Sequence, residues 1–182
     1  GKIFYYDRFN IFFDEAAIIQ SITVYICEEK RFTVSEIEDV LLDLDEYKTV
    51  DYEKAIQVLQ GTLKVLTLDD FPIQYAVIQS NLGKAYDHLA ELKDKAVNCE
   101  KAIQAYKEAL KVYTLDDFPK KYAVIQGNLG FAYGHLAELK DKAVNCEKAI
   151  QAFKEALKVY TKEEFPEVYR IIEENIKNVY EL

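Results

Sequence analysis

Residues 68–114 read LDDFPIQYAVIQSNLGKAYDHLAELKDKAVNCEKAIQAYKEALKVYT, and residues 115–161 repeat this 47-residue stretch with six substitutions. The same spacing relates Phe71, Phe118 and Phe165, each of which is followed by proline. A repeat of this length is typical of stacked helical units, in which each unit buries its apolar face against its neighbours. The sequence therefore predicts an all-α fold made of antiparallel helix pairs.

The six substitutions distinguish constant positions from variable ones. They are Ile73/Lys120, Gln74/Lys121, Ser80/Gly127, Lys84/Phe131, Asp87/Gly134 and Tyr106/Phe153. At about 100° per residue, Ser80, Lys84 and Asp87 share one narrow arc of the first helix, and the unchanged apolar residues lie opposite. Core positions must fit both neighbouring units, whereas an exposed face is free to be tuned for a ligand. We interpret the variable arc as an exposed functional surface.

Each unit is expected to contain two helices joined by a short polar connection. The first helix should begin near Pro72, with Asp70 as a possible cap, and run to about Glu91. Asn98 is then expected to cap a second helix that extends to about Tyr113. The pattern thus predicts long helices that alternate in direction.

The two ends of the chain differ from the repeats. Residues 1–50 are interpreted as an N-terminal capping helix followed by a degenerate first helix, 51–161 as the repeats, and 162–182 as a C-terminal capping helix. Together they form a single continuous domain of about seven or eight helices. The aromatic segment 2–25 is expected to cap the first repeat. The alternative is that it mediates self-association or docks on another domain through an exposed apolar patch.

Composition restricts the classes of partner. The formal net charge of -9 argues against nucleic acid, because phosphates require a basic surface. Segment 2–25 is too often interrupted by charge to cross a membrane. We therefore expect a protein or peptide partner. The three cysteines, Cys27, Cys99 and Cys146, form no Cys-x-x-Cys motif, and no signal-peptide pattern is present, which favours a cytoplasmic, reducing compartment.

Motifs for chemistry are missing from the sequence. His88 and His135 are the two histidines, and each has a single acidic residue, Glu91 or Glu138, on the same helix face. A zinc site needs three or four converging ligands, so no metal is expected. The chain contains no glycine-rich phosphate loop, H-E-x-x-H or G-x-S-x-G motif. We therefore predict a protein without catalytic activity or cofactor.

The repeats resemble the tetratricopeptide repeat family over most of residues 51–182. The resemblance is carried by Asn81-Leu82-Gly83-x-x-Tyr86 and Ala102-x-x-x-Tyr106-x-x-Ala109, and in the second copy by Asn128-Leu129-Gly130-x-x-Tyr133, Ala149, Phe153 and Ala156. The period of 47 residues exceeds the usual period of about 34. The resemblance implies a right-handed α–α superhelix, or solenoid, whose first helices line a concave groove for peptides or helices. Its pattern places the following residues toward the groove: Val77, Ser80, Lys84, Asp87, His88, Val124, Gly127, Phe131, Gly134 and His135.

Phe131 is the most distinctive of these residues. It lies between Gly127 and Gly134, so we expect an exposed apolar spot that a partner, or a second copy of this chain, can approach closely. The alternative is that Phe131 packs on a helix of the next repeat within its own chain.

Three functions follow from these observations. The first is a protein-interaction scaffold that binds a peptide or helix in the groove. The second is a self-assembling repeat protein that associates through the aromatic N-terminus or the Phe131 patch. The third is the regulatory repeat region of a larger signalling enzyme, of the kind that similar repeats in prokaryotic multidomain proteins suggest. The near identity of the copies also fits an engineered or recently duplicated array.

Overall fold

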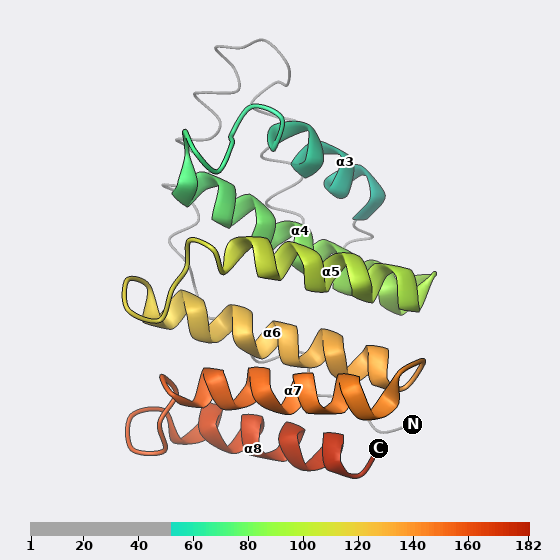
Figure 1. Cartoon of the computed structure of the whole chain (residues 1–182), viewed down its shortest axis with the longest axis vertical. Helices are drawn as coiled ribbons and strands as arrows, with labels where there is room; N and C mark the ends of the chain where they lie inside the picture. The colour runs from blue at the N-terminus through green and yellow to red at the C-terminus, as the bar shows by residue number, and fades with distance from the viewer. Residues whose placement is uncertain (1–51) are drawn as a thin grey trace.

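The computed structural model describes residues 52–182, which are coloured in Figure 1. The predictions for residues 1–50, including the capping helix and self-association through 2–25, lie outside the described residues. Between Tyr52 and Leu182 the chain forms six α-helices and no β-strand. They are α3 (Tyr52–Thr62), α4 (Pro72–Leu92), α5 (Lys95–Ala109), α6 (Pro119–Ala137), α7 (Lys142–Leu157) and α8 (Pro166–Tyr180). The all-α prediction is confirmed for this part of the chain.

Each helix packs against the helix before it and the helix after it. Contacts join α3 to α4, α4 to α5, α5 to α6, α6 to α7, and α7 to α8. Figure 1 shows the chain reversing direction at alternate edges of the array as it passes from α4 to α8. One cluster of buried apolar side chains extends from Ile56 in α3 to Val179 in α8. The stack therefore shares a single continuous core.

The Phe-Pro pairs mark where the first helix of each unit begins. Pro72 occupies the first turn of α4, where a missing N–H leaves no hydrogen bond unmade. The expected Asp70 cap is wrong, because Phe71 holds the capping position without a side-chain hydrogen bond. Asp70 instead accepts a hydrogen bond from the Thr67 hydroxyl at 2.8 Å. This hydrogen bond stabilises the turn that precedes α4.

The second helix of each unit begins earlier and ends earlier than predicted. Lys95, not Asn98, is the first residue of α5, and Ala109 is the last. Asp94 precedes α5 with φ 47° and ψ 44°, a left-handed conformation that reverses the chain sharply. Asn98 lies in the first turn, and its side-chain amide donates to the Lys93 carbonyl at 2.9 Å. The amide therefore fastens the turn from inside the helix.

Gly83 and Gly130 allow the two helices of a unit to approach closely. A Cβ atom at Gly130 would lie 2.7 Å from the Phe153 ring, closer than van der Waals contact permits. A Cβ at Gly83 would overlap the Tyr106 ring in the same way. The glycine of each Asn-Leu-Gly motif is therefore required by packing against α5 or α7.

Aromatic contacts hold the α5–α6 and α7–α8 loops together. Phe118 packs edge to face on Tyr113, with ring centroids 5.3 Å apart, and Phe165 does the same on Tyr160 at 5.3 Å. Ion pairs on the surface, such as Lys95 with Glu138 at 2.9 Å, also connect neighbouring units. Exposed ion pairs contribute little to stability, so the apolar contacts dominate.

Candidate interaction face

The ten predicted groove residues lie on α4 and α6, and the structure separates them into an accessible set and a buried set. Val77, Lys84 and His88 of α4 are partly exposed. The other seven are buried: Ser80, Asp87, Val124, Gly127, Phe131, Gly134 and His135. Every residue of α6 from 123 to 137 is buried. The expectation of an open face along both helices is therefore wrong for α6 and for part of α4.

Phe131 is a core residue. Its side chain is 2% exposed, and its ring meets Phe153 of α7 edge to face, with centroids 5.2 Å apart and planes at 86°. Offset and edge-to-face contacts of this kind are the favoured arrangements of aromatic pairs. The exposed patch predicted at Phe131 is wrong, and with it the route to self-assembly through that residue. Phe131 does pack within the chain, but against α7 of its own unit rather than against a helix of the next repeat.

Asp87 and Tyr106 form a buried polar pair in the first unit. Asp87 is 1% exposed, and Tyr106 donates its hydroxyl proton to Asp87 Oδ2 over 2.6 Å. A buried tyrosine hydroxyl and a buried carboxylate both need hydrogen-bond partners. Each supplies one for the other, which explains why a charged residue is tolerated inside the helix stack.

The second unit replaces this polar pair as a set. Gly134 stands where Asp87 would be, Phe153 replaces Tyr106, and Phe131 replaces Lys84. Exchanging hydroxyl and carboxylate together leaves neither group buried without the other. Three of the six differences between the copies are thus one coordinated exchange where the two helices of a unit meet, with Lys84 at its partly exposed margin.

One further difference, Gln74/Lys121, is explained by a contact between units. The Lys121 ammonium lies 4.9 Å from the centre of the Tyr113 ring and donates to the Tyr113 hydroxyl at 3.4 Å. Leu66 occupies the position of Tyr113 in the preceding unit, opposite Gln74 rather than lysine. Lys120 lies 5.9 Å from the Phe165 ring centre. Lys121 therefore complements the tyrosine that it contacts. The Lys120 contact does not explain the Ile73/Lys120 difference, because Phe118 stands at the position of Phe165 in the preceding unit.

Two buried titratable side chains, His135 and Cys99, are held in their uncharged forms. Burial lowers the pKa of His135 to about 4, and the nearby Lys95 charge acts in the same direction. Burial raises the pKa of Cys99 to about 12, assisted by the charge of Asp87. At neutral pH the imidazole is thus neutral and the thiol is protonated. Both side chains act as interior packing groups.

Metal ligation gains no support from the described residues. Between 52 and 182, no group of three or more His, Cys, Asp or Glu side chains is placed to hold a metal ion. His88 stacks on Tyr52 instead, with ring centroids 5.2 Å apart and planes at 18°. The stack fixes the imidazole at one end of α4.

The accessible part of the predicted groove is therefore a strip on α4, formed by Val77, Lys84 and His88. Their spacing of seven and four residues places them on one side of the helix. The strip offers an apolar side chain, a cation and an aromatic ring in line. Such a surface can contact one side of a peptide or helix.

Sequence analysis missed a second surface, at the edge where the two helices of each unit join. The large apolar side chains that are exposed among residues 52–182 are Leu92, Val97, Leu139, Val144 and Tyr180. We call this set the apolar edge; Figure 1 shows the α4–α5 turn, the α6–α7 turn and the C-terminus on the same side of the array. The sequence signal for this surface is a leucine, Leu92 or Leu139, directly before the Lys-Asp-Lys stretch of each turn. The polar character of the stretch predicts only a short connection.

The chain has no detected relative to guide the assignment. No family model, curated protein or solved structure matches it. Within residues 52–182, no helix has the length and apolar character needed to span a membrane. The function is therefore inferred from the burial and contacts of the described residues.

Proposed function

We propose that this chain is a non-catalytic protein-interaction scaffold of the tetratricopeptide type, a superhelix of helix pairs that binds a peptide or helix. The observation that carries the proposal is the strip of Val77, Lys84 and His88 on α4. It is accessible and chemically mixed, and rigid neighbours support it on both sides. Binding sites on rigid elements lose little conformational freedom when a ligand binds.

The ligand that fits this strip is an extended or helical peptide with an acidic residue near an apolar one. Val77 offers an apolar contact, and the Lys84 ammonium, two helical turns along, can pair with a carboxylate. His88, held by its stack on Tyr52, supplies an aromatic surface at the end of the strip. The alternative role as the regulatory repeat region of a larger signalling enzyme would use the same surface.

A peptide-display selection tests the proposal directly. Random peptides are selected on the wild-type chain, and the enriched peptides are measured by calorimetry against Lys84→Glu. Lys120→Glu, a charge reversal in the first turn of α6 and outside the strip, is the matched control. We expect peptides rich in acidic residues, with affinity reduced about tenfold or more by Lys84→Glu, because a charge reversal replaces attraction with repulsion. Peptides that bind Lys84→Glu and Lys120→Glu equally would refute binding at the strip.

A further inference from the structure

The two helix pairs of the described chain are interchangeable at almost every contact. α5 and the equivalent residues of α7 differ at one position, Tyr106 against Phe153. The glycine that admits each ring is also equivalent, Gly83 in α4 and Gly130 in α6. The same tyrosine-to-glutamate hydrogen bond, 2.8 Å long, joins both pairs: Tyr75 to Glu108 and Tyr122 to Glu155. By shape alone, α5 therefore fits α6 as well as it fits α4, and α7 fits α4 as well as it fits α6.

Two copies of such a chain can exchange helices and keep every contact between successive helices. In the exchanged dimer, α6 of one copy packs on α5 of the second copy, and α4 of the second copy packs on α7 of the first. The remaining contacts, α3 on α4, α5 on α6 and α7 on α8, are those of the monomer. Exchange of this kind is a characteristic failure of repeat proteins. Apart from the cost of association, only the composition of two helix pairs separates this dimer from two monomers.

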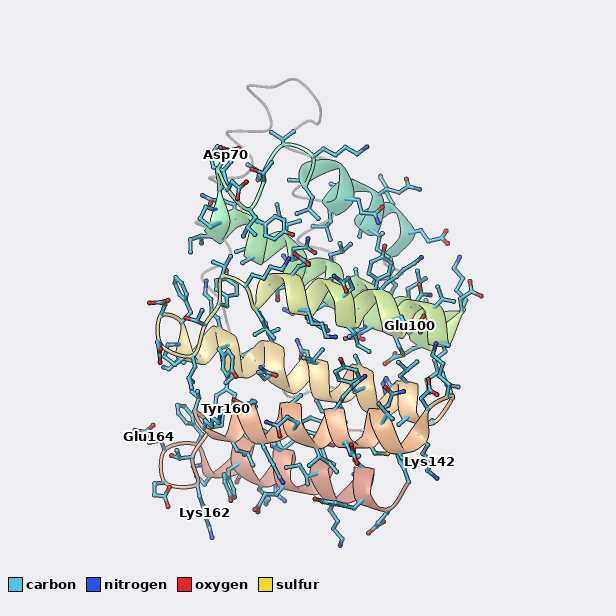
Figure 2. All side chains as sticks on the ribbon, in the orientation of Figure 1. Asp70, Glu100, Lys142, Tyr160, Lys162 and Glu164 are labelled. Atoms are coloured by element: carbon cyan, nitrogen blue, oxygen red, sulfur yellow. The ribbon has the colours of Figure 1, made fainter. Side chains whose placement is uncertain are left out.

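The turns that must open for this exchange are the α4–α5 and α6–α7 turns. Asp94 and Asp141 lie in them with φ 47° and ψ 44°, and they are the non-glycine residues with positive φ among residues 52–182. This conformation is disfavoured for residues that carry a Cβ atom, so opening the turns relieves backbone strain. Figure 1 shows both turns on one side of the array, and Glu100 and Lys142 mark that side in Figure 2. A second copy can therefore reach both turns from the same side.

We infer that the buried polar pair of the first unit, and its replacement in the second unit, prevent this exchange. In the monomer, Tyr106 donates to Asp87 over 2.6 Å, and the equivalent residues of the second unit are Phe153 and Gly134. In the exchanged dimer, Asp87 meets Phe153, which has no hydroxyl, and Tyr106 meets Gly134, which has no carboxylate. Each mispaired interface thus removes one partner of the buried hydrogen bond.

The penalty acts twice in each exchanged dimer. Asp87 and Tyr106 are each 1% exposed, so water does not replace the lost partner. Removing the partner of a buried donor or acceptor changes an equilibrium constant by a factor of about 5 or more, so the two interfaces together weaken the exchanged dimer about 30-fold or more. The native pairs keep their partners. The device therefore acts by disfavouring the wrong pairing, without requiring a stronger contact in the right one.

Refolding of the full chain over a range of protein concentrations tests the inference. Each protein is unfolded in urea, refolded and measured by sedimentation, which distinguishes the 21.1 kDa monomer from a dimer. Asp87→Gly/Tyr106→Phe makes α5 identical to the equivalent residues of α7 and removes both mismatches. The dissociation constant of its dimer should be about 30-fold or more below that of the wild-type dimer.

The matched control moves the polar pair to the second unit. Asp87→Gly/Tyr106→Phe/Gly134→Asp/Phe153→Tyr has the wild-type composition, and its two units again differ. It should therefore refold to a monomer as the wild type does. A dimer that forms through a surface contact, or through exchange without mispairing, should be equally strong in all three proteins, because the substitutions leave those contacts unchanged.

Two results would overturn the inference. The first is an Asp87→Gly/Tyr106→Phe chain that is as monomeric as the wild type at every concentration. The second is a matched control that dimerises as strongly as this double variant, because a difference between the units would then not govern the exchange. Should the double variant lose helicity, Gly134→Asp/Phe153→Tyr, which gives both units the polar pair, must show the stronger dimer for the inference to stand.

Discussion

The buried pair of Asp87 and Tyr106 makes a quantitative prediction about how the two units encode their interiors. Tyr106→Phe removes the hydroxyl that Asp87 Oδ2 accepts from at 2.6 Å, and a hydrogen bond to a charged group contributes about 1.5–3 kcal/mol. Asp87→Gly adds the cost of glycine in a helix, about 1 kcal/mol, to the loss of the Tyr106 partner, about 1–3 kcal/mol. Lys84→Phe, made alone, crowds the interior by about 1–3 kcal/mol. The losses in free energy of unfolding of the three single variants should therefore sum to about 5–10 kcal/mol.

The triple variant Lys84→Phe/Asp87→Gly/Tyr106→Phe should cost much less than that sum. It gives the first unit the interior of the second, where Phe131 packs edge to face on Phe153. We expect the triple variant to fall short of additivity by at least about 2 kcal/mol, the scale of coupling between residues in contact.

Urea unfolding followed by far-UV circular dichroism measures each free energy of unfolding by linear extrapolation. Phe153→Tyr is the matched control in the second unit, where the new hydroxyl faces Gly134 and no carboxylate. It should destabilise the protein by about 1–3 kcal/mol. If the triple variant instead costs the full sum of the single changes, the three positions do not form one coordinated set, and the reasoning fails.

Three further predictions concern other buried positions. Below pH 6.5 the imidazole of His135 takes up a proton in the unfolded chain, but in the folded protein, where its pKa is about 4, it does not. The free energy of unfolding should therefore fall by up to about 3 kcal/mol from pH 6.5 to pH 4. Thermal melts of His135→Gln should show a smaller loss over this range, and His88→Gln is the control. Phe131→Lys should destabilise the chain by about 3–5 kcal/mol through an interior cavity and a buried charge, and an unchanged urea midpoint would contradict its burial. Gly130→Ala forces a Cβ atom against the Phe153 ring, so the melting temperature should drop as expected for overpacking of about 1–3 kcal/mol.

The repeat explains why the helices were predictable. Phe71, Phe118 and Phe165 recur at equal spacing, and the proline after each marks the start of α4, α6 or α8. A signal that occurs three times in one chain averages out local ambiguity. The start of α5 was misplaced because left-handed backbone at Asp94 has no strong sequence signature, whereas Asn98 is a common cap.

The accessible surface was less predictable, because a helical wheel gives the direction of a side chain but not what lies against it. Ser80 and Asp87 vary between the copies and lie opposite the constant apolar residues, which predicts exposure, yet both are buried. The information was present in a pairwise form, since Tyr106 loses its hydroxyl in the same copy in which Asp87 loses its carboxylate. Reading Asp87/Gly134 and Tyr106/Phe153 as one correlated pair, rather than as separate points on a wheel, would have placed these two positions in the interior.

The position of the polar set within the chain has a consequence for how such proteins change over generations. Lys84, Asp87 and Tyr106 all fall inside residues 68–114, so a duplication event with its borders in the loops copies the entire set at once. One copy can then exchange this set for apolar residues and glycine without requiring changes in the other copy. The contact of Lys121 with Tyr113 instead joins two units, so a substitution at either residue affects the packing of both copies.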